Sequence, residues 1–361
     1  MDYYPVKKCL QVLFERQIPL SKAQNHHLSD LCLAVLLAGQ THLSKIARQL
    51  DHPTQQASRI QWIRRLLDAP YSSPEYAYSP FIKSLLHSYA SPTLHLLIDR
   101  TDLVDHKLDL VCISLNFHRH AIPIVWQIVP NGMTGYRQQK ELIRRCIPLI
   151  PTTKSVVFHG DNEFGSVTTM RYVHQQGWDF ILAQSSTNYY YPTRHAPPQT
   201  LATLPVTPTQ AVYRQDILLT KKHQYGPLNL FAFYHPVYHH NRRKQDIRYY
   251  ATSLPVTQNL RRIGKRRWGI ECYFKDLKSA GWQLPMSQLH HIKRYNSLVT
   301  ILNLAYSWIT CLGRWLSKTS QRHLIDNKPT PHLSLFRLGW DWLVHTFRCG
   351  QLCPVLTTLY R

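Results

Sequence analysis

The spacing of hydrophobic residues changes twice along this chain and divides it into three parts. Up to about residue 88 the apolar positions recur with a helical period. From Pro92 they form short runs bounded by turn residues, which is typical of strands. After Ser253 the helical spacing returns and continues toward the C-terminus. The pattern therefore predicts an α/β region between two helical regions.

The first part contains the outline of a helix-turn-helix. Two helices are expected on either side of Asp51-His52-Pro53, with Thr54 as the cap of the second. That second helix has an apolar face and carries Arg64 and Arg65. Many helical pairs share this outline, so the interpretation depends on the charge of the whole chain. We predict that residues 1–88 form a helical DNA-binding region.

Strands and helices alternate in the second part. Strands are expected at 94–99, 108–117, 121–129, 155–159 and 178–183, with helices at 135–147 and 166–176 before the last two strands. Three strands, a helix, a strand, a helix and a strand is the order of the ribonuclease H-like fold. We therefore predict a protein of the α/β class, with a ribonuclease H-like catalytic core at residues 89–185 and 247–285.

Residues 186–246 interrupt that core. They are rich in Pro, Tyr, Thr and His, and strand-like pieces at 210–219 and 228–234 predict a β-rich insertion. Residues 286–361 are expected to form a C-terminal helical region. Its most apolar helix, Leu298–Leu316, is interrupted by polar residues, so it is predicted to be buried in the protein rather than to cross a membrane.

The charge of the chain indicates a polyanionic partner. It has 43 Lys and Arg residues against 20 Asp and Glu, which is a formal net charge of +23 with His neutral. Such a surface attracts nucleic acid, with an anionic membrane surface as the weaker alternative. The N-terminal stretch lacks the apolar core of a signal peptide, which favours a cytoplasmic protein. Because acids are scarce, an acid in a prominent motif carries more weight than usual.

Eight cysteines are scattered along the chain. His345, Cys349 and Cys353 have an H-x3-C-x3-C spacing, which zinc fingers do not use, and no second pair lies close by in the sequence. Reduced and mostly buried thiols in a cytosolic protein are therefore the better interpretation.

Three carboxylates stand at positions where they can meet. Asp99 ends the first expected strand, Asp161 ends the fourth, and Glu271 lies on a helix that can pack against the sheet edge. In a sheet of this order the two strands are neighbours, so both aspartates point into one crevice. Converging carboxylates repel each other, and a pair of divalent cations removes that repulsion. Magnesium prefers such oxygen ligands, and two ions about 4 Å apart can hold the reacting oxygens of a phosphodiester.

Each of these acids also has a simpler interpretation. An aspartate at a strand end often caps a turn or helix, and Asp161 could cap the next helix through the loop it begins. Three further acids compete with Asp99 in the same stretch, namely Asp102, Asp105 and Asp109. Only the joint match of two strand ends and a helix favours a catalytic site.

The stretch RRWGIECYFKDLKSAGW surrounds Glu271 with cations. Arg266, Arg267, Lys275 and Lys278 face only two acids there. On a helix, Arg267 four residues before Glu271 and Lys278 seven after it share its face. We expect the cations to hold DNA phosphates while the glutamate binds metal. The alternative is an ordinary solvated helix face.

These motifs together resemble a known family. Asp99-Arg100-Thr101-Asp102, the run Gly160 to Ser166 (GDNEFGS), Arg267 to Glu271 (RWGIE) and Phe274 to Ser279 (FKDLKS) resemble the DDE transposases of bacterial insertion sequences. The branch resembled has a β-strand insertion before the Glu and a signature of Tyr, Arg, Glu and Lys separated by two, three and six residues. The resemblance covers roughly residues 20–310. The Tyr position is Gly264 here, which departs from the signature.

The resemblance implies a function and assigns roles to residues. Asp99, Asp161 and Glu271 match the catalytic triad that binds two Mg²⁺ ions, for which Mn²⁺ can substitute. Arg267 and Lys278 match the positions that contact DNA, and we add Arg266, Lys275, Arg64 and Arg65 as DNA-binding candidates. The implied enzyme is a DNA transposase of a mobile element. Metal-activated water cleaves at the insertion-sequence end, and the freed 3′-hydroxyl attacks target DNA in strand transfer.

The same resemblance implies partners and leaves alternatives open. The partners are double-stranded DNA, as terminal inverted repeats and as target, and a second copy of the chain in a homodimer that bridges two ends. The location is the bacterial cytoplasm, in association with the nucleoid. One alternative is a ribonuclease H-like nuclease without strand transfer. Another is a non-catalytic DNA-binding protein derived from a transposase.

The insertion adds one further expectation from the resemblance. In relatives that form a DNA hairpin, a flipped base stacks on an aromatic residue of this region. The candidates are Tyr189, Tyr190, Tyr191, Tyr213, Phe231 and Tyr234, each of which could instead be a core or strand residue.

Overall fold

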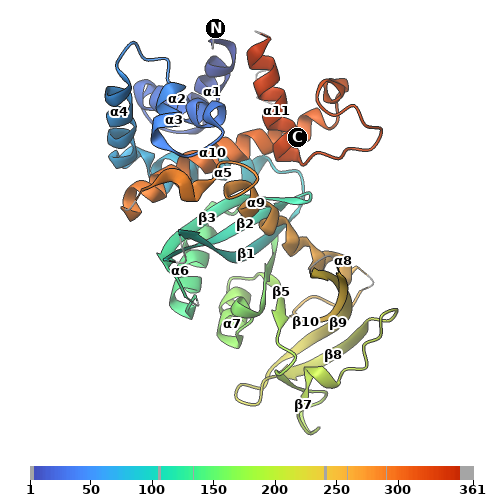
Figure 1. Ribbon diagram of the computed structural model, residues 1–361. Helices are drawn as coiled ribbons and strands as arrows, with labels where there is room; N and C mark the ends of the chain where they lie inside the picture. The colour runs from blue at the N-terminus through green and yellow to red at the C-terminus, as the bar shows by residue number, and fades with distance from the viewer. Residues whose placement is uncertain are drawn as a thin grey trace.

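A single ten-stranded sheet is the centre of the protein, as a computed structural model shows. The structure describes residues 4–104, 107–132, 134–239, 242–257, 259–289 and 291–349. The strand order in the sheet is β3-β2-β1-β4-β5-β10-β9-β8-β6-β7. Helices α6 and α7 lie on one face of its first half, and α9 and α10 lie on the other (Figure 1). The prediction of a mixed α/β protein is confirmed.

The first five strands have the order expected of a ribonuclease H-like core. They are β1 (Thr93–Val104), β2 (Leu108–Phe117), β3 (His120–Pro130), β4 (Ser155–Gly160) and β5 (Asp179–Gln184). β2 is antiparallel to β1 and β3, whereas β1, β4 and β5 run parallel. α6 (Tyr136–Cys146) precedes β4 and α7 (Val167–Gln175) precedes β5. Every element predicted for residues 94–183 is therefore present.

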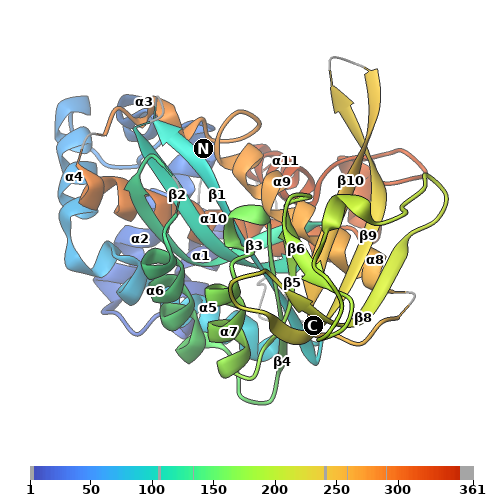
Figure 2. The same cartoon turned by 90° about the horizontal axis from the view of Figure 1, so that it is seen from below.

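The insertion continues this sheet. Its strands are β6 (Tyr189–Tyr191), β7 (Gln199–Thr200), β8 (Val212–Leu219), β9 (Tyr225–His239) and β10 (Arg242–Thr252), with a 3-10 turn η5 (Leu201–Thr203). The end of β10 pairs with β5, so β10 runs without a break across the boundary expected after residue 246. Figure 2 shows the insertion strands leaving the core sheet on its β5 side.

The N-terminal part is helical. It comprises α1 (Tyr4–Gln17), α2 (Lys22–Ala38), α3 (Leu43–Arg48), α4 (Gln56–Asp68), η1 (Pro70–Ser72), η2 (Pro74–Tyr78) and α5 (Ser79–Ser88). α3 and α4 are the two helices of the expected helix-turn-helix. The prediction that Thr54 caps the second is wrong, because α4 starts after Gln55 and no side chain caps it.

The C-terminal part contains α8 (Leu260–Gly264), η6 (Lys265–Arg267), α9 (Trp268–Leu277), η7 (Leu284–Ser287), α10 (Ile292–Leu316), η8 (Ser320–Leu324) and α11 (Leu335–Arg348). Nearly all of α10 after Tyr295 is buried, as predicted. It contacts α2 and α4 on one side, β3 on another and α11 along its second half. Within the described ranges, no helix combines the length and the apolar character that a bilayer span requires.

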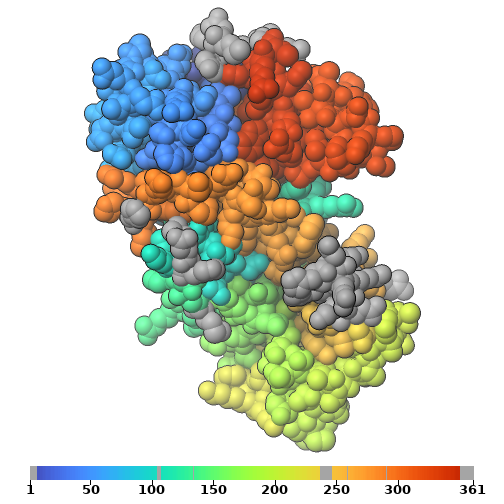
Figure 3. Space-filling model, in the orientation of Figure 1, coloured from blue at the N-terminus to red at the C-terminus, as the bar shows by residue number. Residues whose placement is uncertain are grey.

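The two terminal regions form one body around α10. In Figure 3 the blue N-terminal helices lie beside the red C-terminal ones, above the orange segment that includes α10. The Thr41 hydroxyl donates to the carbonyl oxygen of Gln283 at 3.0 Å, and the Cys32 thiol lies 3.6 Å from the carbonyl oxygen of Ile301. Cys32, Cys112, Cys146 and Cys311 are free thiols and buried, as expected, and Cys9 is buried as well. Cys353 of the zinc-like spacing lies outside the described residues.

Candidate active site

Asp99 and Asp161 lie on neighbouring parallel strands. The ladder between β1 and β4 pairs Ile98 with Gly160, and the next residue on each strand is a candidate catalytic aspartate. A Cβ atom on Gly160 would lie 2.8 Å from Phe164 and 3.0 Å from Ile98, so only glycine permits this approach. The buried apolar run before Asp99 and the glycine before Asp161 therefore bring the two carboxylates to one place.

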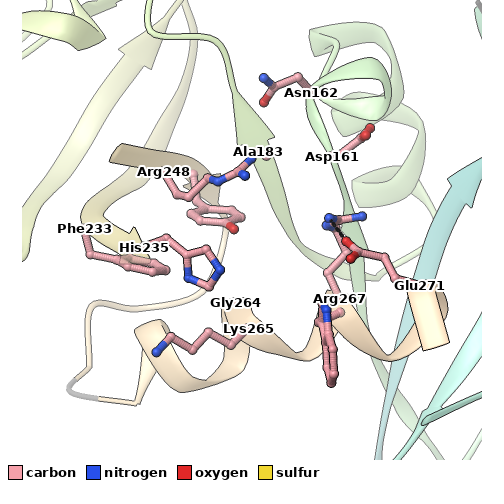
Figure 4. A pocket seen from close by; sticks show the side chains of 12 residues that line it. Asp161, Asn162, Ala183, Phe233, His235, Arg248, Gly264, Lys265, Arg267 and Glu271 are labelled. Atoms are coloured by element: carbon pink, nitrogen blue, oxygen red, sulfur yellow. Dashed lines mark hydrogen bonds and ion pairs between the residues drawn. The ribbon is translucent and has the colours of Figure 1, made fainter. Parts of the chain in front are cut away.

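Glu271 reaches the same place from a helix. α9 packs over β1, β2 and β3, so it covers the face of the sheet. The sequence had led us to expect that this helix packs against the edge of the sheet, and that expectation is wrong. Gly269 makes the approach possible, because a Cβ atom there would lie 2.8 Å from the carbonyl oxygen of His120. The Glu271 side chain is 44% exposed and lies beside Arg267, on the side of α9 toward Asp161 (Figure 4).

Arg267 joins two of the three acids. One guanidinium nitrogen donates to Oδ2 of Asp99 at 2.6 Å, and the other pairs with Oε1 of Glu271 (Figure 4). Burial by itself lowers the pKa of Arg267, but the charges of Asp99, Glu271 and Asp161 outweigh it and raise the pKa. A single cation thus lies among three carboxylates.

The pKa values of both aspartates are raised above the ordinary value. Burial raises the pKa of Asp99 to about 6 against the opposing effect of Arg267, and repulsion from Asp161 and Glu271 adds to the rise. Burial likewise raises the pKa of Asp161, while Arg267 opposes the rise. Carboxylates that are costly to ionise together are poised to accept additional positive charge.

A divalent cation fits the chemistry of this donor set. Carboxylate oxygens, of which Asp99, Asp161 and Glu271 supply three pairs, are the hard ligands that magnesium prefers. Among the described residues no three His, Cys, Asp or Glu side chains already stand close enough to hold an ion. Arg267 bridges Asp99 and Glu271, so it would have to withdraw before these carboxylates could share a metal.

Two of the three acids, Asp161 and Glu271, border a cavity of about 460 Å³ between the core sheet, the insertion and α9. Asp161 and Glu271 lie at one end of it, and Lys265 and His235 lie at the other (Figure 4). Arg248 adds a second cation from β10. The cavity thus joins the acidic group to a basic wall, which suits a phosphate-containing ligand.

Aromatic residues that the sequence had not singled out line this cavity. Phe233 and Tyr250 come from β9 and β10, and Trp268, which is 59% exposed, comes from the start of α9. Phe233 and Tyr250 are stacked with ring centroids 5.9 Å apart and planes 11° apart. Trp268 stands in the basic stretch beside Arg267, and an aromatic residue between cations is the signal that could have found it.

None of the six aromatic candidates named from the sequence lines the cavity. Phe231 and Tyr190 are buried, at 0% and 2% exposure, and therefore cannot receive a base without rearrangement. Phe231 instead stacks between Tyr213 and Tyr250, with ring centroids 6.4 and 5.0 Å away. These residues build the core of the insertion.

The signature positions other than Arg267 and Glu271 have structural partners. Lys278 ends α9, and its ammonium donates to Oδ1 of Asp102 at 2.8 Å and to the Thr101 hydroxyl at 3.0 Å. Gly264, at the Tyr position, is buried, and a Cβ atom there would lie 3.3 Å from the ring of Phe231. A side chain at Gly264 would therefore have to displace that ring.

The remaining candidate cations differ in exposure. Lys275, Arg64 and Arg65 are exposed, whereas Arg266 is half-buried and its carbonyl oxygen accepts from Asn116 at 3.2 Å. Asp109, one of the competing acids, is fully buried on the opposite side of the sheet from Asp99, where it pairs with Arg100. Asp105 lies outside the described residues.

This core, with two aspartates on adjacent parallel strands and a glutamate on the covering helix, has the arrangement of the DDE class of enzymes. A family model described as "Transposase DDE domain" matches residues 113–308, more than half of the chain. The chain therefore belongs to the DDE transposase family. The matched range contains Asp161 and Glu271 and starts after Asp99.

Comparison with solved structures finds a similar chain in the cryo-EM structure of a piggyBac transposase synaptic complex with hairpin DNA. It is 11% identical to this chain with a TM-score of 0.43, and the similarity covers 99% of this chain and 80% of that one. Comparison with curated proteins finds no match.

Proposed function

We propose that this protein is an active DNA transposase that cleaves the ends of a bacterial insertion sequence and joins them to target DNA. The observation that supports it best is the convergence of Asp99, Asp161 and Glu271 around Arg267 beside a basic and aromatic cavity. No residue need form a covalent bond to DNA in such a reaction.

Metal is part of this proposal. DDE transposases in general use divalent ions, and Asp99, Asp161 and Glu271 would hold two Mg²⁺ ions here, with Mn²⁺ as a substitute. Such ions supply an activated water and neutralise charge on the phosphate. The contribution of the chain is to place the carboxylates and, through Arg267, to offset their mutual repulsion before metal and DNA bind.

DNA binding is assigned to two groups of residues. Arg64 and Arg65 on α4 would contact the terminal inverted repeat, while Arg266, Arg267, Lys275 and Lys278 would hold phosphates near the cleaved bond. Arg267 and Lys278 can do so only by exchanging their present carboxylate partners. The working form would be a homodimer that bridges two ends.

The cavity extends the proposal to the nucleotide beside the cleaved bond. Trp268 is exposed at its mouth, and Phe233 and Tyr250 form an aromatic wall. Stacking of a base on an aromatic ring contributes about 1–3 kcal/mol in single-strand binding proteins. Of these three, Trp268 is exposed enough to receive a base, whereas Phe233 and Tyr250 are 2% and 8% exposed and would support it from within the wall. We therefore add Trp268 to the candidates named from the sequence.

The test is an assay with the full chain and DNA that carries the repeats flanking its reading frame. Asp161→Ala should lose metal-dependent cleavage by several orders of magnitude, because loss of one ligand removes metal activation. Asp99→Ala and Glu271→Ala should behave alike. Glu141→Ala is the matched control, since Glu141 is an exposed acid paired with Arg144 on α6.

The outcomes separate the alternatives. Cleavage with strand transfer supports the transposase. Cleavage without joined products indicates a nuclease, and end binding without cleavage indicates a DNA-binding derivative. Near-normal cleavage by Asp161→Ala would refute the assignment of the site.

A further inference from the structure

Two charged residues next to the candidate catalytic aspartates are paired with each other. Arg100 follows Asp99, and its backbone N–H donates to Oδ1 of Asp99 at 2.8 Å. Glu163 lies two residues after Asp161, and its backbone N–H donates to Oδ1 of Asp161 at 3.1 Å. Nε of Arg100 donates to Oε2 of Glu163 at 3.1 Å. Each residue thus holds one aspartate through its backbone and the other residue through its side chain.

The pair belongs to a mostly buried network on the opposite face of the sheet from the aspartates. Successive side chains of a strand point to opposite faces, so Arg100 points away from Asp99. Its second contact is with Oδ2 of Asp109 at 2.6 Å. The side chains of Arg100, Glu163 and Asp109 are 26%, 14% and 1% exposed, unlike those of a surface ion pair. Removing one partner of such a pair leaves an uncompensated charge.

The network is anchored on elements outside the two strands. Asp109, on β2, also accepts from the side chain of Asn131 at 3.0 Å and from the backbone N–H of Gly132 at 3.1 Å. Glu163 accepts from the backbone N–H of Thr134 at 2.6 Å, in the segment before α6. The pair is thereby fixed to β2 and to the segment that connects β3 with α6.

The position of the pair explains what it can control. The β1–β4 ladder ends at Ile98 and Gly160, while β1 itself continues to Val104. Backbone hydrogen bonds between the strands therefore no longer fix the separation of the chain at Asp99 and Asp161. In the described part of the chain, the contact between Arg100 and Glu163 is the side-chain pairing that crosses this interval directly after the ladder.

We propose that Arg100 and Glu163 are positioning residues that set the separation and orientation of the Asp99 and Asp161 carboxylates, and thereby the affinity of the site for divalent metal. The inference rests on the proposed function, because it assumes that these aspartates bind metal. Partners that orient metal ligands typically change metal affinity or activity 10–100-fold when they are removed.

The deciding variant is Glu163→Gln. Glutamine keeps the size of the side chain and an oxygen for Thr134, but it loses the charge that Arg100 faces, and Arg100 retains Asp109. We measure Mn²⁺ binding by electron paramagnetic resonance, using the full chain with excess duplex DNA. The dissociation constant for Mn²⁺ should rise about 10–100-fold. The thermal midpoint without metal should stay near that of the parent.

Two further variants make the result decisive. Glu141→Gln, the same substitution in the exposed pair on α6, should bind Mn²⁺ like the parent. Arg100→Lys keeps a charge but cannot span Glu163 and Asp109, so it should weaken Mn²⁺ binding as well. If Arg100→Lys does not fold, Glu163→Gln alone decides. Parental Mn²⁺ affinity in Glu163→Gln would overturn the proposal.

Asp161→Asn separates this failure from failure of the proposed function. Loss of Mn²⁺ binding in Asp161→Asn together with normal binding in Glu163→Gln would leave the metal site standing and reject the positioning role. Equal binding by the parent and Asp161→Asn, or no binding by the parent, would reject the metal site itself and the inference with it.

Discussion

At the scale of single residues, the site is arranged for binding charge and not for stability. Asp99 is 8% exposed and close to two other carboxylates, and Arg267 offsets only part of their repulsion. Active sites commonly keep such unfavourable arrangements at the expense of folding free energy. Arg267 illustrates the same compromise. Its charge offsets the repulsion between the carboxylates in the absence of metal, but its contacts with Asp99 and Glu271 occupy the oxygens that a metal ion would need.

Asp99→Asn should therefore stabilise the metal-free protein at neutral pH. The folded-state pKa of about 6 exceeds the ordinary value of 3.8, so the folded state binds the proton more tightly. The stability associated with that proton is fully present below about pH 4 and is lost as the pH rises through 6. At pH 7.5 the variant should gain on the order of 1–3 kcal/mol in the free energy of unfolding.

The measurement is chemical denaturation in the presence of a chelator, at pH 7.5 and at the lowest pH where the protein stays folded. The gain from Asp99→Asn should shrink as the pH falls. Asp51→Asn, at an exposed position, is the control. A variant less stable than the parent at pH 7.5 would show that the contact with Arg267 outweighs burial.

At the scale of elements, the helical layer that covers the core sheet depends on glycines where helices cross closely. α10 and α11 meet where Gly313 and Gly339 face each other, and a Cβ atom on Gly339 would lie 2.2 Å from the carbonyl oxygen of Ile309. Backbone atoms cannot move aside as a flexible side chain can. α10 also packs against β3 and against α2 and α4, so a shift of α10 at this crossing would disturb the packing of these elements.

Gly339→Ala should consequently push α11 away from α10. Overpacking of this kind costs about 1–3 kcal/mol or more. We expect a lower denaturation midpoint, measured by circular dichroism. Lys293→Ala, at an exposed position of α10, should leave the midpoint unchanged. An unchanged midpoint in Gly339→Ala would mean that the two helices can separate without loss of packing.

At the scale of the whole molecule, the N-terminal DNA-binding candidate is not a separate body. α2 and α4 pack on α10, and Asp68 of α4 pairs with Arg294 of α10, with the closest atoms 2.7 Å apart. A fragment that contains only the predicted DNA-binding region, residues 1–88, would expose the surface that α10 covers. DNA recognition by α3 and α4 should therefore be examined in the full chain.

Replacing Arg64 and Arg65 by Ala in the full chain should weaken binding to the terminal repeat. Both side chains are exposed on α4 and support no buried contact, so the fold should persist. Each lost phosphate contact should lower the slope of log affinity against log salt by about 1. The measurement is a salt titration with repeat DNA and with unrelated duplex. Unchanged slopes on both would remove α4 from the DNA interface.

The sequence by itself determined the elements and their order, because both follow from short-range patterns. Apolar runs and turn residues located β1 to β5, α6 and α7. The order of these elements was sufficient to predict a ribonuclease H-like core and the meeting of Asp99 with Asp161. The motif around Glu271 was recognisable because its residues lie within one short stretch of the sequence.

Only the tertiary structure decided which residues far apart in the chain face one another. In the folded protein Arg267 lies between Asp99 and Glu271, and Lys278 pairs with Asp102. Phe231 is buried, whereas Phe233 lines the cavity. The tertiary structure also joined the N-terminal helices to α10 and extended the core sheet through β10. Such pairings depend on packing across long separations in sequence, where a shift of one residue along a strand exchanges the buried face for the exposed one. No local pattern of hydrophobic and polar positions carries that information.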